Sequence, residues 1–275
     1  MSQTFEVLYP CMGTVFRFAG NSEQSPAQTQ SILDQACALL DEADRTFSLY
    51  KPESPLSKLA RGETSVALCP PVVDQVWNLC EDWEKTTQGW FSAFTPQNTF
   101  DPSGLVKTWA AQKAADHLLE SGIDDFTLNA GGDVFIAPGA SSPIDWRIGI
   151  SKPVSIASAE AGVLTVLDLR GKGFTSMATS GTAERGEHIW NPKAPDKAAA
   201  NELVQVSVVA QDLVTADVWA TAAFAMGARC IDILNAHNLA NPQAQVQALA
   251  VWPNGDLGAT DGFIGLFAKP ETSQG

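Results

Sequence analysis

The spacing of apolar residues near the start of the chain predicts a hairpin followed by a long helix. Two alternating segments, residues 5–9 and 14–18, flank Met12-Gly13 and predict two antiparallel strands. Ser25-Pro26-Ala27-Gln28 then has the spacing of a capping box, with Pro at the first helical position. Apolar residues at the helical period continue this helix over residues 26–45.

Two further helices are predicted before the middle of the chain. Apolar residues at helical spacing begin at Val72 and continue to Trp83, and this helix is expected to end near Gly89. The next helix, residues 105–121, follows the segment 101–104 and stops at Gly122, which suits the position just after a helix. Its beginning is therefore expected to be a junction between a loop and a helix.

The rest of the chain is rich in short apolar runs that predict strands. Strands are expected at residues 126–129, 134–137, 146–150, 204–209 and 263–267, and in hairpins of 162–169 with 174–179 and around Asn254-Gly255. The polar, Ala-rich segment 193–201 is expected to be a surface flap.

The composition of the chain fits a globular protein and argues against several partners. Of the 275 residues 45% are hydrophobic, and the net charge of -14 disfavours nucleic acid and anionic membrane surfaces. No run reaches the roughly 20 apolar residues of a membrane span, and no signal peptide is visible at the N-terminus, so a cytoplasmic location is expected. The cysteines are odd in number and lack a C-x-x-C pair, which predicts buried free thiols: Cys11, Cys37, Cys69, Cys80 and Cys230.

Asp217 is the only charged residue in the apolar stretch 213–228, and Thr221 follows it on the same helical face. A carboxylate buried there costs several kcal/mol unless it is paired. Oxygen ligands of this kind suit a hard cation such as Mg²⁺. Alternatively, Thr215 could be the N-cap, which would place Asp217 in the first turn where the helix dipole stabilises an anion without a metal. The spacing leaves both interpretations open.

Two other segments carry candidate chemistry. Residues 177–192 join the end of a strand, Thr179-Ser180-Gly181, to Arg185 and His188, and could hold an anion or be an ordinary polar loop. Gly131-Gly132 lies between two strands, where it allows either close approach of a ligand or a plain tight turn. Neither a G-x-G-x-x-G nor a G-x-x-x-x-G-K-[ST] motif is present, which argues against Rossmann and P-loop sites.

Six segments in order resemble the ApbE-type FAD:protein FMN transferases. They are residues 12–14, 47–50 with 54–59, 101–110, 129–133, 179–181 with 188–192, and 216–227. The resemblance runs from about residue 5 to 268 and implies a single domain over residues 1–275. It also implies an α+β fold, with mixed, largely antiparallel sheets, packed helices and FAD in a central cleft.

The resemblance also implies roles for individual residues. Mg²⁺ would be held by Asp217, Thr221 and the carbonyl of Gly104. Asp101, Lys107 and His188 would act in catalysis as well as in FAD binding. The remaining residues of the FAD site would be Met12, Tyr50, Trp90, Phe91, Ser92, Ser180 and Gly181, with Trp90 and Phe91 against the flavin or adenine ring.

The chain departs from the family pattern at three places. The usual K-G pair is Lys107-Thr108, the acidic residue usual after the Gly near position 89 is replaced by Ser92, and the usual H-[IL]-[ILV]-D-P-R-T-G reads H-I-W-N-P-K-A-P from His188. The last change alters the loop that shapes the flavin or acceptor side of the site.

The function implied by the resemblance is Mg²⁺-dependent transfer of the FMN moiety of FAD to a Thr or Ser hydroxyl of an acceptor flavoprotein, with release of AMP. Lys107 would add positive charge near the phosphates in a protein of net charge -14. Two alternatives share the same cleft: a Mg²⁺-dependent FAD pyrophosphatase that releases FMN and AMP, and a non-catalytic FAD-binding protein.

Overall fold

Eight strands form one antiparallel sheet in the computed structural model of the chain, which describes residues 2–95, 99–137, 139, 142, 147–153, 162–182, 192–193 and 203–269. The order across the sheet is β1-β2-β3-β4-β7-β8-β9-β10, and β5 with β6 forms a separate two-stranded sheet. The strands are β1 (Gln3–Cys11), β2 (Thr14–Ser22), β3 (Asp125–Ala130), β4 (Asp133–Ala137), β5 (Arg147–Ser151), β6 (Val163–Asp168), β7 (Ser176–Gly181), β8 (Gln205–Ala210), β9 (Gln247–Val251) and β10 (Leu257–Ala259).

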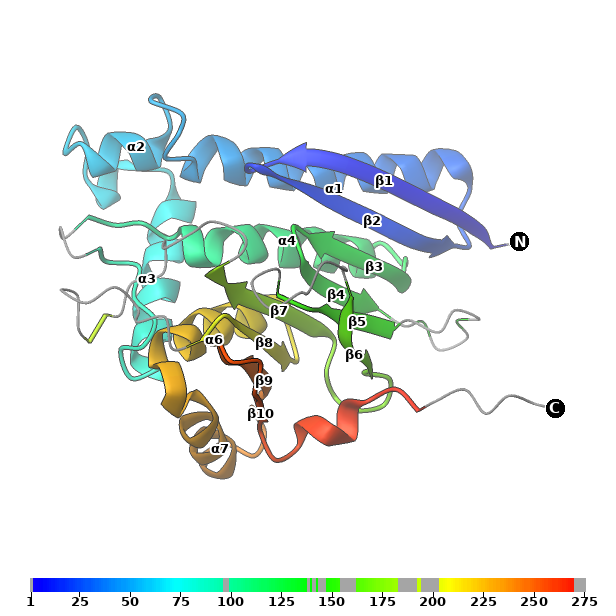
Figure 1. Ribbon diagram of the computed structural model, residues 1–275. Helices are drawn as coiled ribbons and strands as arrows, with labels where there is room; N and C mark the ends of the chain where they lie inside the picture. The colour runs from blue at the N-terminus through cyan, green and yellow to red at the C-terminus, as the bar shows by residue number, and fades with distance from the viewer. Residues whose placement is uncertain are drawn as a thin grey trace.

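Three long helices cover one face of this sheet. Figure 1 shows α1 (Pro26–Phe47), α4 (Ser103–Glu120) and α6 (Leu213–Met226) one after another along the sheet, with α4 in the middle. The described helices also include α2 (Pro55–Ala60), α3 (Pro71–Thr86) and α7 (Cys230–Ala240), and the short 3₁₀ helices η1 (Val66–Leu68), η2 (Gly227–Arg229) and η3 (Phe263–Leu266).

The strands in the middle of the sheet are buried on both faces. Successive side chains point to opposite sides of the sheet, and each side is covered by an apolar cluster. Ala178 of β7 and Val208 of β8 face the helices, whereas Met177 and Val209 face a second apolar cluster. That second cluster is built from β5, β6 and η3, through residues such as Ile150 and Phe263. The sheet is thus the central layer, with β7 among its strands, and the site helices α4 and α6 lie on its helical side.

The local sequence signals explain the N-terminal elements. Met12 and Gly13 both have positive φ, 51° and 73°, as the two-residue turn between β1 and β2 requires. Ser25 caps α1 with a complete capping box, and Pro26 is the first helical residue. The predictions of the first hairpin, the helix from residue 26, the helices near 72 and 105, and the hairpin at 254–255 are confirmed.

Two predictions about the C-terminal half are wrong. The expected hairpin of residues 162–169 and 174–179 does not form, because β6 pairs with β5 while β7 pairs with β4 and β8. The expected strand at residues 263–267 is the 3₁₀ helix η3, in which Phe263 and Leu266 are buried at helical spacing. The expected flap at residues 193–201 lies outside the described residues apart from Lys193.

Candidate functional site

Asp217 is buried inside α6, at 7% exposure, as the apolar surroundings in the sequence predict. The N-cap of α6 is Asp212 and not Thr215: Asp212 Oδ1 accepts from the Thr215 backbone N–H at 2.8 Å. Asp217 therefore lies beyond the first turn, and the alternative that the helix N-terminus alone stabilises its charge is wrong.

A hydroxyl of the neighbouring helix contacts the Asp217 carboxylate. Thr108 Oγ1 of α4 lies 2.8 Å from Asp217 Oδ2 and donates its hydrogen to it. Thr108 Oγ1 is also 3.1 Å from the carbonyl oxygen of Leu105, in the first turns of α4. The Asp217 carboxylate is thus held close to the turn that contains Gly104, although the two segments are far apart in the sequence.

Thr221 lies one turn after Asp217 and faces β7. Its Oγ1 is 3.5 Å from Ser180 Oγ, and Ser180 is buried at 7% exposure. Gly181 ends β7, and a Cβ at this position would lie 2.7 Å from the carbonyl oxygen of Val204. Close packing of the chain just before β8 is sufficient to require this glycine, whether or not a ligand is bound nearby.

The junction before α4 is shaped by Asp101. Its Oδ1 accepts from the backbone N–H of Ser103 at 3.0 Å, an Asx turn that starts the helix, and also contacts the Ser103 hydroxyl. Phe91 packs beneath this junction: it is 3% exposed, and its Cε2 would lie 3.5 Å from a Cβ at Gly104. The Phe91 side chain is therefore part of the core that supports the first turn of α4.

Lys107, one turn into α4, forms an ion pair with Asp133 at the start of β4. The pair is well buried, with side-chain exposures of 16% for Lys107 and 4% for Asp133. Asp133 Oδ1 also accepts from the Thr179 backbone N–H of β7 at 3.1 Å. Asp133, at the start of β4, thus contacts both α4, which carries Lys107, and β7, which carries Ser180.

The turn between β3 and β4 explains the paired glycines. Gly131 and Gly132 have φ of 66° and 106° and connect the paired residues Ala130 and Asp133. The tight-turn interpretation is confirmed. A Cβ at Gly131 would lie 2.3 Å from Thr14 Oγ1, so the turn also needs a glycine because β2 approaches so closely.

The remaining expected FAD residues differ widely in exposure. Tyr50 is 98% exposed, whereas Met12 and Ser92 are half-buried. Trp90 is half-buried too, and the Lys193 ammonium lies 4.4 Å from the centroid of its ring. His188, Arg185 and the altered segment from Asn191, apart from Pro192 and Lys193, lie outside the described residues.

The described part of the chain holds no cluster of three or more His, Cys, Asp or Glu side chains that could bind a metal ion. The expected donors are of another kind: one carboxylate, one hydroxyl and one backbone carbonyl. All are oxygen donors, and a buried carboxylate one turn before a threonine, beside the beginning of α4, fits Mg²⁺ with substrate oxygens and water completing the shell.

The cysteines are free, as predicted, and four of the five are buried. Burial raises the pKa of Cys80 to about 12 and that of Cys11 to about 11, with the charges of Asp101 and of Asp44 as the next contributions, respectively. Because the thiolate is the nucleophile, neither thiol is activated near neutral pH. Neither Cys80 nor Cys11 is therefore a candidate nucleophile for covalent catalysis.

A model of the ApbE family matches residues 93–243, more than half of the chain. The chain belongs to the ApbE family. The matched region contains α4, the β3–β4 turn, β7 and α6, and with them the contacts among Thr108, Asp217, Lys107 and Asp133.

Curated relatives of this ApbE family member include the FAD:protein FMN transferase of Klebsiella pneumoniae (strain 342), 30% identical over 140 residues, which are 48% of this chain and 40% of that protein. The enzyme of the same name from Vibrio cholerae (strain O395) is 28% identical over 140 residues, with the same shares. The matches thus span well under two thirds of the length of these relatives.

Solved structures of ApbE proteins show the same fold along nearly the whole chain. The flavin transferase ApbE from Vibrio cholerae has a TM-score of 0.76 at 20% identity, over 97% of this chain and 100% of that one. The ApbE protein from Thermotoga maritima has a TM-score of 0.78 at 20% identity, over the same shares. The α+β architecture expected from the sequence is confirmed.

Three residues that hold the candidate site residues in place were missed in the sequence. Asp212 has an available signal, an acidic residue just before an apolar helix. Thr108 and Asp133 act across sequence separations of 109 and 26 residues, which no local pattern reveals.

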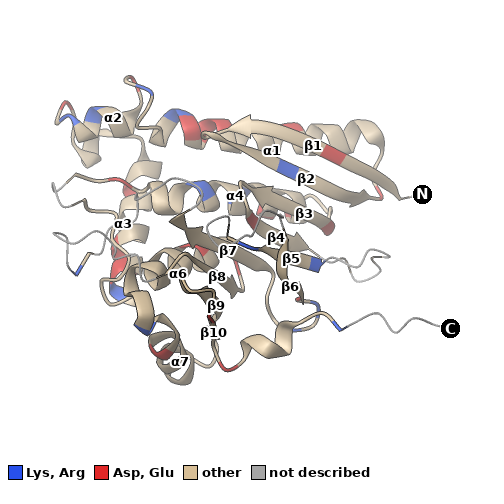
Figure 2. Ribbon diagram, in the orientation of Figure 1, with Lys and Arg blue, Asp and Glu red and all other residues tan. Residues whose placement is uncertain are grey.

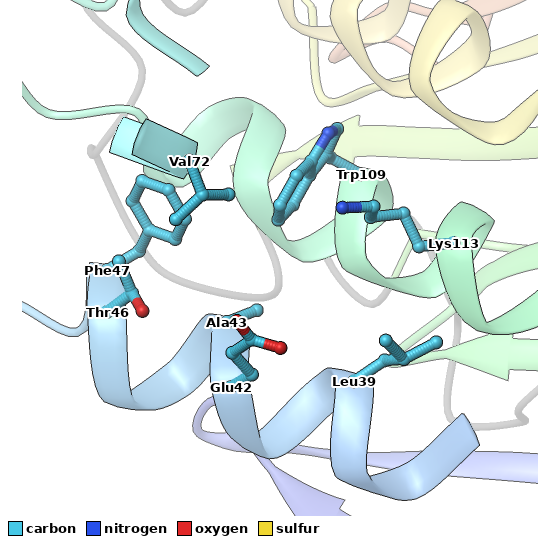
Figure 3. Close-up of a pocket in the computed structure, with 8 residues that line it drawn as sticks. All are labelled: Leu39, Glu42, Ala43, Thr46, Phe47, Val72, Trp109 and Lys113. Atoms are coloured by element: carbon cyan, nitrogen blue, oxygen red, sulfur yellow. The ribbon is translucent and has the colours of Figure 1, made fainter. Parts of the chain in front are cut away.

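A small pocket lies elsewhere, between α1 and α4 near the start of α3 (Figure 3). Lys113 extends over the Trp109 ring, 4.4 Å from its centroid, and Glu42 is the other charged residue of the lining. None of the residues expected to bind FAD or metal lines this pocket.

None of the helices in the described ranges has the length and apolar character needed to cross a bilayer.

Proposed function

We propose that this protein is a Mg²⁺-dependent FAD:protein FMN transferase, which moves the FMN moiety of FAD onto a Thr or Ser hydroxyl of an acceptor flavoprotein. The observation that carries the proposal is the buried carboxylate of Asp217, held by Thr108 next to the first turn of α4 and followed one turn later by Thr221. Curated relatives that match about half of this chain are named FAD:protein FMN transferase, which supports the substrate and the acceptor class.

Asp217, Thr221 and the Gly104 carbonyl would hold the cation. When bound, Mg²⁺ would supply Lewis-acid stabilisation of charge on the pyrophosphate of FAD. The protein's own contribution is to present one anionic and two neutral oxygens from two packed helices, so that only one negative charge has to be dehydrated.

Lys107 would bind the phosphates. Its ammonium pairs with Asp133 Oδ2, and Asp133 Oδ1 accepts from the Thr179 N–H. The Lys107 ammonium therefore has a defined position before substrate arrives. This matters because the net charge of -14 repels an anionic dinucleotide, and Figure 2 shows acidic residues along α1 and α3. The binding site must therefore generate its own local attraction.

Aromatic contacts with FAD are assigned to Trp90. The ring of Phe91 is 3% exposed and packs beneath Gly104, so we propose a supporting role for it instead of stacking. Met12, Tyr50 and Ser92 would contribute the remaining contacts, together with Ser180, Gly181 and His188.

In the proposed reaction, the acceptor hydroxyl oxygen forms a bond to the FMN phosphorus. The bond from that phosphorus to the bridging oxygen breaks, AMP leaves with the bridging oxygen, and the hydroxyl proton is released. Asp101 or His188 would accept that proton. Asp101 is already oriented by the Ser103 N–H at the start of α4, close to Gly104 and Lys107 in the sequence.

We also propose that the chain acts as one domain. The eight-stranded sheet includes β1 and β2 from the beginning of the chain and β9 and β10 from near its end, which supports a single unit.

The test is flavin transfer to a candidate acceptor. The protein is incubated with FAD, Mg²⁺ and acceptor, and the product is followed by in-gel flavin fluorescence and by the mass of the acceptor. Asp217→Ala should abolish transfer, and Thr221→Val should weaken it less because it removes a neutral ligand. Asp125→Ala is the matched control. Asp125 is also 7% exposed, but it begins β3, at the end of that strand opposite the turn that leads to Asp133.

The outcomes separate the alternatives. Release of FMN and AMP without a heavier acceptor would indicate a pyrophosphatase, in which water takes the place of the hydroxyl. Tight FAD binding without AMP release would indicate a binding protein. Full Mg²⁺-dependent transfer by Asp217→Ala would refute the metal assignment.

A further inference from the structure

Thr108 is fully buried, and its hydroxyl lies between two acceptors. Oγ1 is 2.8 Å from Asp217 Oδ2 on α6 and 3.1 Å from the Leu105 carbonyl on its own helix, at 0% exposure. A hydroxyl has a single hydrogen to donate. The carboxylate is the stronger acceptor, because hydrogen bonds to ionised groups are shorter and stronger than those to neutral ones.

A buried threonine in a helix does not need a second helix to satisfy its hydroxyl. Donation to the carbonyl three or four residues earlier is common, and Leu105 offers that acceptor. The additional contact with Asp217 fixes one carboxylate oxygen relative to α4, the helix whose first turn carries Gly104. Thr108 thus connects the two helices that would supply the metal ligands.

We propose that Thr108 is a positioning residue for the metal site: its hydroxyl orients the Asp217 carboxylate through the hydrogen bond to Oδ2. The inference rests on the metal role in the proposed function. Groups that hydrogen-bond to a metal ligand restrict its orientation, and their loss typically lowers metal affinity about 10- to 100-fold.

The experiment measures Mg²⁺ affinity directly, without turnover. Isothermal titration calorimetry of MgCl₂ into the full chain is carried out alone and with saturating ADP, a pyrophosphate nucleotide that carries no FMN to transfer. Thr108→Val keeps the shape of the side chain and removes the hydroxyl, and it should raise the Kd for Mg²⁺ about tenfold. Thr108→Ser restores the hydroxyl and should return the Kd to within about twofold of wild type.

A matched control separates positioning from general packing. Thr29 of α1 is 3% exposed, and its hydroxyl is 2.9 Å from Ser22 Oγ at the end of β2, so it does not contact Asp217 or Thr221. Thr29→Val should change thermal stability without changing the Kd for Mg²⁺. Thermal unfolding of each variant without Mg²⁺ shows whether the fold is retained.

An unchanged Kd in Thr108→Val, while Asp217→Ala no longer binds Mg²⁺, would refute the role of Thr108 and leave the proposed function intact. Failure of Thr108→Ser to restore affinity would refute it as well, because the methyl group would then be the important part. Wild-type protein that takes up Mg²⁺ under neither condition would overturn the metal assignment and this inference together.

Discussion

Replacing Gly131 with alanine should destabilise the protein for two separable reasons. Gly131 has φ of +66°, a left-handed conformation that costs roughly 1–2 kcal/mol in a residue with a Cβ. The new Cβ would also lie 2.3 Å from Thr14 Oγ1 and 3.2 Å from Thr14 Cβ. Forcing extra volume into a packed site typically costs about 1–3 kcal/mol. These two contributions sum to about 2–5 kcal/mol, from which the roughly 0.4–1 kcal/mol gained by a less flexible unfolded chain is subtracted, as for any Gly→Ala change.

Gly171 provides the control for the conformational part. It has the same φ of +66°, but a Cβ there would have no atom within 4 Å. Gly171→Ala should cost only the backbone strain, partly offset by the roughly 0.4–1 kcal/mol that Gly→Ala gains from a less flexible unfolded chain. Gly131→Ala should exceed Gly171→Ala by about 1–3 kcal/mol, the steric contribution.

Urea denaturation followed by circular dichroism measures both variants. The double variant Thr14→Ala with Gly131→Ala removes the atom at 2.3 Å and should cost less than the sum of the single variants. Equal losses for Gly131→Ala and Gly171→Ala would refute the steric argument. Because Asp133 follows this turn and pairs with Lys107, Gly131→Ala should also reduce flavin transfer more than Gly171→Ala.

Three further results are expected. The half-buried Cys69 should react with a thiol reagent such as DTNB before the other cysteines, whereas Cys230, whose pKa burial raises to about 12, should react only on unfolding. Burial lowers the pKa of His237, so the unfolded chain binds the proton more tightly than the folded one. The free energy of unfolding should therefore fall as pH drops below about 6.5. His237→Gln should flatten this dependence between about pH 7.5 and 5.5. Ser25→Ala removes the N-cap of α1 and should cost about 1 kcal/mol in denaturant unfolding, whereas the exposed Ser31→Ala inside the same helix should cost nothing measurable.

The elements with local signals were predictable from the sequence. The capping box at Ser25, the glycine after α4 at Gly122 and the turn at Met12-Gly13 each specify a helix end or a hairpin through the residues themselves. The wrong hairpin shows the limit of such signals. Gly171 and Gly173 do have positive φ, but a turn does not determine which sheet the next strand joins. Burial of η3 against β5 and β6 likewise depends on a surface formed by distant residues.

The N-cap of α6 shows a different kind of error, because its signal was present. Asp212 directly precedes the apolar run and Thr215 lies three residues later, and both residue types can cap a helix. The structure selects Asp212, whose Oδ1 and Oδ2 bind the Thr215 N–H and hydroxyl at 2.8 Å and 2.6 Å. Consequently, Asp217 lies deeper in the helix than a capping role allows, and its carboxylate faces α4 instead of the helix end.

The burial of Asp217 could be predicted, but its orientation could not. An isolated charge in an apolar helix indicates a buried acid, because a helix that is apolar on all sides is buried when it packs. The direction of the carboxylate depends on Thr108, which lies 109 positions away on α4, and no local pattern connects the two residues. A metal site needs both properties, since a ligand oxygen that is free to rotate loses orientation entropy on binding. Under the proposed function, the sequence indicates which carboxylate would bind the cation, and the packing of α4 against α6 would determine how strongly it does so.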